Sequence, residues 1–174
     1  LQLTKPEYFN WVMEVFYEMN VKSYPESKAL IWRHNERERF YTFKSIYNEA
    51  NQFLNFCRTH GIKKGDSIYS QLPLDPSNWI SLLAAIKGGF ILIPSSTNLT
   101  ERDIEYRFKT LFPQVVIADL ANAVKIDTAE KLLGKSVKVK IIVDGEMEGW
   151  HNFKEIYKED KESDAAYTRA DDNL

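Results

Sequence analysis

The chain has 174 residues, of which 44% are hydrophobic and 28% are charged, and its net charge is −2. This composition is typical of a folded globular domain, and the lack of a basic stripe argues against a nucleic-acid partner. No apolar run approaches the roughly 18 residues of a membrane helix, so we expect no membrane partner. The single cysteine, Cys57, cannot form an internal disulfide, which agrees with a cytoplasmic location.

The first third of the chain predicts a helix, a hairpin and a second helix. Apolar residues recur at helical spacing from Pro6 to Val21 and predict an amphipathic helix. β-branched and aromatic residues flank a polar turn in the segment 29–43, as in a β-hairpin. Thr42 is placed to cap a helix that continues to Cys57 and that Gly61 stops.

The middle of the chain predicts two strands around a buried helix. "DSIYSQL" is a strand, and Asp75 caps the next helix with Pro76 at its first position. That helix is apolar nearly all round, so we expect it to be buried between layers. The continuous run "FILIP" predicts a strand covered on both faces.

The last part continues the alternation of helix and strand. Thr100 and Asp103 resemble a capping box, and the helix they open has an inward stripe of Ile104, Phe108, Leu111 and Phe112. "QVVIAD" and "VKVKIIVD" are predicted strands, with a weaker helix over 120–133 between them and a short helix at "HNFKEIY" after them.

Together these elements predict an α/β fold with a doubly wound, mainly parallel sheet, helices on both faces and a small β-hairpin. Residues 1–157 are expected to form this α/β subdomain. Residues 158–174 are polar and unpatterned, so we expect an exposed linker that leads out of it.

Two motifs look like ligand sites but have simpler explanations. Ala129–Ser136, "AEKLLGKS", ends like a phosphate-binding loop, yet it has alanine for the first glycine and precedes a strand instead of following one. We therefore interpret it as a helix stop and turn. Cys57 and His60 have metal-ligand spacing, but no second pair completes a tetrahedral site, and the sequence cannot place His34 or His151 near them.

The loop after "FILIP" is the other candidate, because ligands of open α/β sheets bind beyond the carboxyl ends of strands. Pro94 closes the strand, and the hydroxyls of Ser95, Ser96 and Thr97 are able to bind a ligand. None of these serines, nor Ser70, lies in the G-x-S-x-G context of a nucleophile. We favour a connecting role for the loop. The sequon at Asn98 is better explained by Thr100 acting as a helix cap.

Residues 60–108, "HGIKKGDSIYSQLPLDPSNWISLLAAIKGGFILIPSSTNLTERDIEYRF", resemble the N-terminal part of the AMP-forming acyl-CoA synthetase superfamily of AMP-binding enzymes. The pattern is a helix ending in HG, then "GIKKGD", a strand, a proline-bearing turn with Trp, an apolar helix to "KGG" and a strand ending in Pro. "YFNWVMEVFYEM", "ALIWRHNERERFYTFKSI" and "EGWHNFKEIY" extend the resemblance over almost the whole chain, most closely to medium-chain and acetyl-CoA synthetase-like members.

The resemblance implies a ligase that joins a short- or medium-chain fatty acid to CoA through an acyl-adenylate, using ATP and Mg²⁺. It also implies a phosphate-binding loop after a segment like "ADDNL", beyond residue 174, so no catalytic, cofactor-binding or metal residue is assigned to this chain. We expect these 174 residues alone to be inactive, to hold no cofactor, and to self-associate through exposed apolar surface.

One alternative stays open at this point. A complete, stand-alone flavodoxin-like domain that binds a small ligand or a protein partner would have the same alternation of strands and helices. It would bury its sheet edges and end in a docked element.

Overall fold

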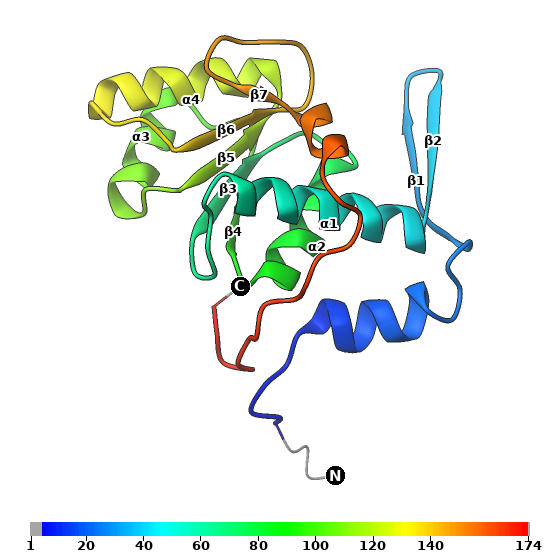
Figure 1. The fold of residues 1–174 in the computed structure, drawn as a ribbon. Coiled ribbons are helices and arrows are strands. Elements are labelled where there is room, and N and C mark those ends of the chain that lie inside the picture. Colours follow the sequence, from blue (N-terminus) through cyan, green and yellow to red (C-terminus); the bar gives the residue numbers. More distant parts are fainter. Residues whose placement is uncertain (1–4, 174) are drawn as a thin grey trace.

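The fold is organised around a five-stranded parallel sheet with the strand order β4-β3-β5-β6-β7. The computed structural model describes residues 5–173 and shows the sheet with helices on both faces and a separate hairpin (Figure 1). The predicted α/β architecture is thus confirmed. The strands are β3 (Ser67–Gln71), β4 (Ile91–Pro94), β5 (Val115–Ala118), β6 (Val139–Ile142) and β7 (His151–Asn152).

Two hydrophobic cores lie on opposite faces of this sheet. On one face, α1 (Phe43–Thr59) and α2 (Ser77–Gly88) pack on Val115 and Ile117. On the other face, α3 (Glu101–Thr110) and α4 (Leu120–Leu133) pack on Val116 and Ala118. Successive side chains of a strand point to opposite faces, so β5 is apolar at every position and fully buried.

The predicted hairpin is confirmed. β1 (Lys28–His34) and β2 (Arg37–Thr42) pair antiparallel, with Ile31 opposite Phe40. Asn35 has a left-handed φ of 54° in the turn, a conformation that asparagine tolerates better than most residues. The hairpin projects away from the sheet beside α1 (Figure 1).

The caps predicted at Thr42 and Thr100 both form, while Asp75, the third predicted cap, accepts from the N–H of Ser77 at 2.9 Å although α2 begins only at Ser77, after Pro76. The Thr42 hydroxyl accepts from the N–H of Ser45, and the Thr100 hydroxyl accepts from the N–H of Asp103. In each case the third residue of the helix returns a bond to the backbone of the cap, which completes a capping box.

Loss of the second cap has a measurable consequence. Thr100→Ala removes the acceptor for the Asp103 N–H, so the free energy of unfolding should fall by about 1 kcal/mol in urea denaturation. Thr110→Ala, at the exposed other end of α3, is the control and should change stability by less than about 0.5 kcal/mol. Equal losses in the two variants would contradict the capping role.

The N-terminal helix is shorter than predicted. It is a π-helix, η1 (Val12–Val21), preceded by Trp11 in helical conformation, and residues 5–10 are not helical. The N–H of Phe9 donates to the carbonyl of Thr168 at 3.0 Å, and Tyr8 pairs with Arg169. Helical spacing alone predicted that these residues belong to the helix, but their backbone instead pairs with a distant segment of the chain.

Two predictions of complete burial were wrong. β4 is an edge strand, so its apolar residues are only half-buried. α2 buries Ile80 and Leu83 against α1, but Trp79 and Leu82 remain 37% and 40% exposed on its outer side. Neither helix packing nor edge position can be read from a continuous apolar run.

Two helix predictions were also inexact. The predicted short helix near residue 151 begins with the two-residue strand β7 and continues as the 3₁₀-helix η2 (Phe153–Lys158). α3 ends at Thr110, so Leu111 leaves the predicted stripe and is 46% exposed. No helix among residues 5–173 is long and apolar enough to cross a membrane.

The segment after η2 has no regular secondary structure, but it is not a free linker. Side chains of α1 hold its backbone: Asn51 donates to the carbonyl of Lys161 at 2.8 Å, and Asn55 donates to that of Glu162 at 2.8 Å. Near its end, Thr168 is buried. The segment therefore docks on α1, which the polar composition concealed. The domain bounds at residues 1 and 174 lie outside the described residues and stay predictions.

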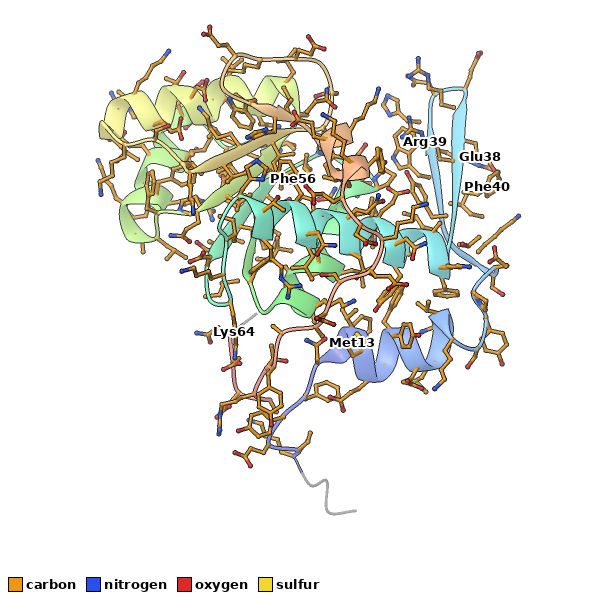
Figure 2. The ribbon with its side chains drawn as sticks, viewed as in Figure 1. Met13, Glu38, Arg39, Phe40, Phe56 and Lys64 are labelled. Carbon is orange, nitrogen blue, oxygen red and sulfur yellow. The ribbon has the colours of Figure 1, made fainter. Side chains whose placement is uncertain are left out.

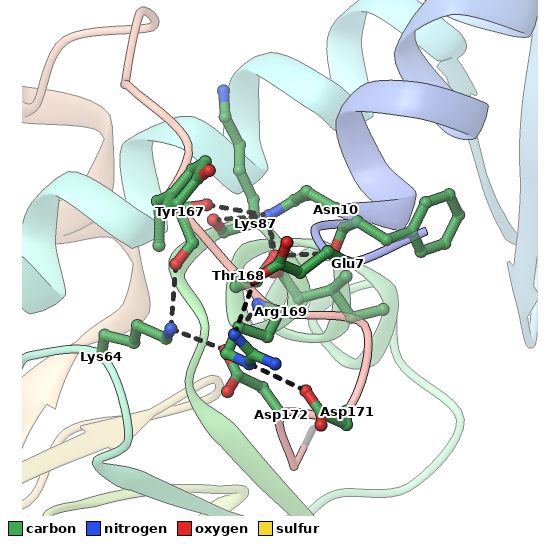
Figure 3. Close-up of polar contacts among 12 residues, drawn as sticks. Glu7, Asn10, Lys64, Lys87, Tyr167, Thr168, Arg169, Asp171 and Asp172 are labelled. Carbon is green, nitrogen blue, oxygen red and sulfur yellow. Dashed lines mark hydrogen bonds and ion pairs between the residues drawn. The ribbon is translucent and has the colours of Figure 1, made fainter. Parts of the chain in front are cut away.

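Figure 3 shows what anchors the end of this segment. The Asn10 carboxamide donates to the carbonyl of Lys87 at 3.2 Å and to the Thr168 hydroxyl at 3.4 Å. Lys64 donates to the carbonyl of Tyr167 at 2.9 Å and forms an ion pair with Asp172 at 2.6 Å. Both ends of the described chain thus meet at the C-terminal end of α2.

Candidate functional site

The candidate site is the edge where the parallel strands end, because open α/β sheets bind ligands beyond the carboxyl ends of their strands. The register brings Gln71 level with Ala118, and Ala118 level with Ile142. β3 lies between β4 and β5, the next two strands of the chain. The chain therefore goes from β3 to β4 on one side and then back past β3 to β5 on the other side. The boundary between β3 and β5 is thus the switch point of the sheet.

A buried polar network fills this switch point. The Tyr69 hydroxyl donates to Gln71 Oε1 at 3.0 Å, and burial raises the pKa of Tyr69. Gln71 Nε2 donates to the Ser96 carbonyl at 3.1 Å and to Asn122 Oδ1 at 3.2 Å. Gln71 and Asn122 are almost completely inaccessible to solvent, so the network closes the crevice that a ligand needs.

The loop Pro94–Thr97 is held by its backbone. The Ser96 and Thr97 carbonyls accept from Gln71 and from Lys125, the latter at 2.9 Å, and the Ser96 hydroxyl accepts from the N–H of Asn98 at 3.2 Å. The buried Ser95 hydroxyl has no hydrogen-bond partner among residues 5–173. These contacts support the connecting role that the sequence favoured for the loop.

Breaking the network should loosen this loop. Gln71→Leu removes the partner of the Tyr69 hydroxyl and of the Ser96 carbonyl, which should lower the free energy of unfolding by about 1–3 kcal/mol. Amide hydrogen exchange should then rise at 96–98, while Ser67→Ala, at the opposite end of β3, should leave that loop protected. Unchanged exchange at 96–98 in Gln71→Leu would contradict the network's role.

Beside this network lies a mostly apolar groove of about 530 Å³ along α3 and the edge strand. Its lining includes Ile93, Leu99, Tyr106, Phe108 and Leu111, together with the charged side chains of Asp103 and Arg107. A groove of this size is able to take a small molecule, but it brings no nucleophile together with a base.

The structure places the sequence motif Ala129–Ser136 at the C-terminal end of α4. Gly134 has a left-handed φ of 63° and ends the helix, as predicted. Backbone carbonyls carry the partial negative charge of a helix dipole at this end, so the segment repels phosphate where a true loop attracts it.

Cys57 and His60 do not form a metal site together. Cys57 is fully buried, and its burial raises the pKa of its thiol well above the usual range, so it stays protonated. His60 Nδ1 lies 2.8 Å from the carbonyl of Phe56. Among residues 5–173 no group of three or more His, Cys, Asp or Glu side chains has a metal-binding arrangement. The structure nevertheless places His151 beside His60, which the sequence could not do.

The buried Lys87 and the half-buried Glu49 were not among the predicted site residues. Lys87, on the apolar helix α2, donates to the Tyr47 hydroxyl at 2.7 Å and to Asn51 Oδ1 at 2.6 Å, and its burial lowers its pKa to about 8. Glu49 lines a partly open cavity of about 250 Å³ under the hairpin; its partial burial raises its pKa, and the Tyr157 hydroxyl donates to it at 3.1 Å. No sequence signal marks either group, because their partners are distant in the chain.

Arg39 lines the same cavity from β2. Figure 2 shows Arg39 on the side of the hairpin that faces the body of the protein and Phe40 on the other side. Asp75 and Lys154 also line it, so the cavity has two positive and two negative side chains, but its lining residues do not pair a nucleophile with a base.

The chain is similar in sequence to known CoA ligases. It is 35% identical to 4-hydroxybutyrate–CoA ligase 1 of Metallosphaera sedula over 94% of this chain and 28% of the ligase. It is 27% identical to the mitochondrial acyl-coenzyme A synthetase ACSM3 of Homo sapiens over 91% of this chain and 28% of the synthetase.

Solved structures share the fold. The anthranilate CoA ligase AuaEII in complex with anthranoyl-AMP superposes with a TM-score of 0.80 at 21% identity, over 96% of this chain and 31% of its own. An acyl-CoA synthetase of Brucella canis superposes with a TM-score of 0.81 at 23% identity, over 99% of this chain and 31% of its own. This chain therefore spans less than a third of the length of each of these four proteins.

The family model of the AMP-binding enzymes matches residues 17–173, which is nearly the whole chain. Its match includes every strand of the parallel sheet and the four α-helices around it. The chain belongs to the AMP-binding enzyme family.

Proposed function

We propose that the chain is the N-terminal α/β scaffold of an AMP-forming acyl-CoA ligase, which converts a carboxylic acid, ATP and CoA into acyl-CoA, AMP and pyrophosphate. The observation that carries the proposal is the family match over 17–173 together with the shared fold of two CoA ligases. In such a ligase Mg²⁺ accompanies ATP, and an acyl-adenylate is the intermediate.

The substrate we propose is a short- or medium-chain acid, which places the ligase in fatty-acid metabolism. Support comes from the relative named for 4-hydroxybutyrate, a four-carbon acid. The anthranilate ligase takes an aromatic acid, so the fold alone does not select the acyl group. We also propose a cytoplasmic location, consistent with the unpaired thiol of Cys57.

The chain's own role in this proposal is structural. Negative charge that develops when an adenylyl group is transferred from ATP requires positioned donors, a lysine and a metal ion. The polar side chains at the carboxyl edge of the sheet, Gln71 and Asn122, are instead occupied with each other. We therefore propose that the chain alone is inactive and holds no cofactor, and that it self-associates through exposed apolar residues such as Leu74 and Leu82.

A chimera tests the proposal. The segment of the Metallosphaera ligase that aligns with this chain is replaced by it, and CoA thioester formation from 4-hydroxybutyrate and ATP is measured. The folded chimera should be active and the isolated chain should read as background. A folded but inactive chimera, or turnover by the isolated chain, would count against the proposed role.

The stand-alone flavodoxin-like alternative keeps two supporting observations, one of which is that the segment after η2 docks on α1. The strand order places β3 between the next two strands, as in that fold. However, the switch point where a flavodoxin-like domain binds its ligand is closed by Gln71 and Asn122. A stop codon after residue 174 would favour this alternative, and a following Ser/Thr/Gly-rich segment that ends in Pro-Lys would exclude it.

A further inference from the structure

His60 and His151 form a close pair although they are far apart in sequence. His60 follows the last turn of α1, and His151 begins β7. Their ring centroids lie 4.7 Å apart at an interplanar angle of 70°. Phe56, which Figure 2 labels on α1, packs against both rings with centroid distances of 4.2 and 5.4 Å. The pair therefore joins two elements at a defined spacing.

The hydrogen bonds of both rings fix the same tautomer. A carbonyl oxygen only accepts, so the 2.8 Å contact between His60 Nδ1 and the Phe56 carbonyl requires a proton on Nδ1. His151 Nδ1 lies 3.3 Å from Glu155 Oε2, and a carboxylate likewise only accepts. Each neutral ring then carries its lone pair on Nε2.

Glu155 is held beside the His151 ring, because its other carboxylate oxygen accepts from the N–H of Asn152 at 3.0 Å. Metal-bound histidines usually donate their second ring N–H to a carboxylate or a backbone carbonyl, which orients the ring and makes Nε2 more basic. His60 and His151 each have one of these two partners.

Both histidines are half-buried. Neither Nε2 atom has a hydrogen-bond partner among residues 5–173, and the His151 side chain is 37% exposed. Two imidazoles at neighbouring positions of one metal ion, with metal–nitrogen bonds of about 2.0–2.1 Å, have ring centroids roughly 4.5–5 Å apart. The observed 4.7 Å agrees with that spacing.

We propose that His60 and His151 bind one divalent transition-metal ion through their Nε2 atoms, with water in the remaining positions. Imidazole ligands favour Cu²⁺, followed by Ni²⁺ and Zn²⁺, over Mg²⁺ and Ca²⁺. The bound ion links the end of α1 to β7, so it also stabilises the folded chain. This site is independent of the proposed ligase activity.

The test is calorimetric titration of the chain, without a polyhistidine tag, with Ni²⁺. We expect one ion per chain. His60→Ala and His151→Ala should each weaken binding at least about tenfold, because the second nitrogen ligand is lost. The control is His34→Ala: His34 is the third histidine, lies on the hairpin stacked on Trp32, and should not affect binding.

Two further measurements keep the result unambiguous. Circular dichroism shows whether each variant is folded, and Glu155→Gln, which keeps both ligands, should weaken binding less than His151→Ala does. The electron paramagnetic resonance spectrum of bound Cu²⁺ should show coupling to two ring nitrogens in the wild type. Binding no stronger than millimolar, or equal affinity in the wild type and the folded His60→Ala and His151→Ala variants, would overturn the proposal.

Discussion

Leu54→Ala should lower the free energy of unfolding by about 3–4 kcal/mol, because it opens a cavity between α1 and α2. Leu54 is completely buried, and it lies over Gly88 at the end of α2. A Cβ atom added at Gly88 would stand 2.6 Å from Leu54 Cδ1 and 3.0 Å from Phe90 Cε2. Gly88→Ala alone should therefore destabilise by about 1–3 kcal/mol through overpacking.

The two changes should compensate each other. In the Leu54→Ala background the methyl group of Gly88→Ala enters the vacated space, so it should cost little or even stabilise the helix end. Urea denaturation of the four proteins gives the coupling energy. Leu132→Ala, which replaces an exposed leucine on α4, is the control background. In it, Gly88→Ala should lower the free energy of unfolding as much as it does in the wild type. Additive losses for Leu54 and Gly88 would contradict the close packing of these helices.

The buried Lys87 should make stability rise with pH. Its pKa is lowered from 10.5 to about 8, first by burial and then by repulsion from Arg58, while Asp164 opposes the shift. Between these two pKa values the unfolded chain still binds a proton that the folded chain has released. Raising the pH through this window therefore favours folding, with a slope of at most about 1.4 kcal/mol per pH unit.

Lys87→Met tests this assignment. The variant should lose the upward slope from about pH 8 to pH 9.5, since the titrating amine is gone. Lys44→Met, which removes an exposed lysine on α1, should retain the slope. The titration should end below pH 10, which is about the usual tyrosine pKa. Burial raises the pKa of Tyr47, so above that pH the titration of Tyr47 makes stability fall as the pH rises. Equal slopes in all three proteins would show that Lys87 is not the group responsible.

Local chemistry made much of the fold predictable from sequence. Thr42 and Thr100 have the residue types that cap helices, and Gly61 and Gly134 provide the left-handed turns that end them. The apolar run "QVVIAD" was predicted to be a strand, and it forms β5. These signals depend on neighbours in the chain, so they do not need the tertiary structure.

The predictions were wrong where contacts with distant segments determine local structure and burial. Phe9 lies outside the helix, where its N–H donates to the carbonyl of Thr168, and β4 is half-buried because it lies at the sheet edge. Likewise, only the fold brings Gln71 to Asn122 and His60 to His151. The candidate site could be located at the loop after β4, but its closure by a buried network could not be foreseen.

The proposal that this chain is a scaffold without a nucleotide site of its own is tested most directly by calorimetric titration of the isolated chain with ATP in the presence and absence of Mg²⁺. The closed switch point and the position of Gly134 at a helix C-terminus predict no Mg²⁺-dependent binding up to millimolar ATP. Mg²⁺-dependent binding of ATP with micromolar affinity by these 174 residues would contradict the proposal.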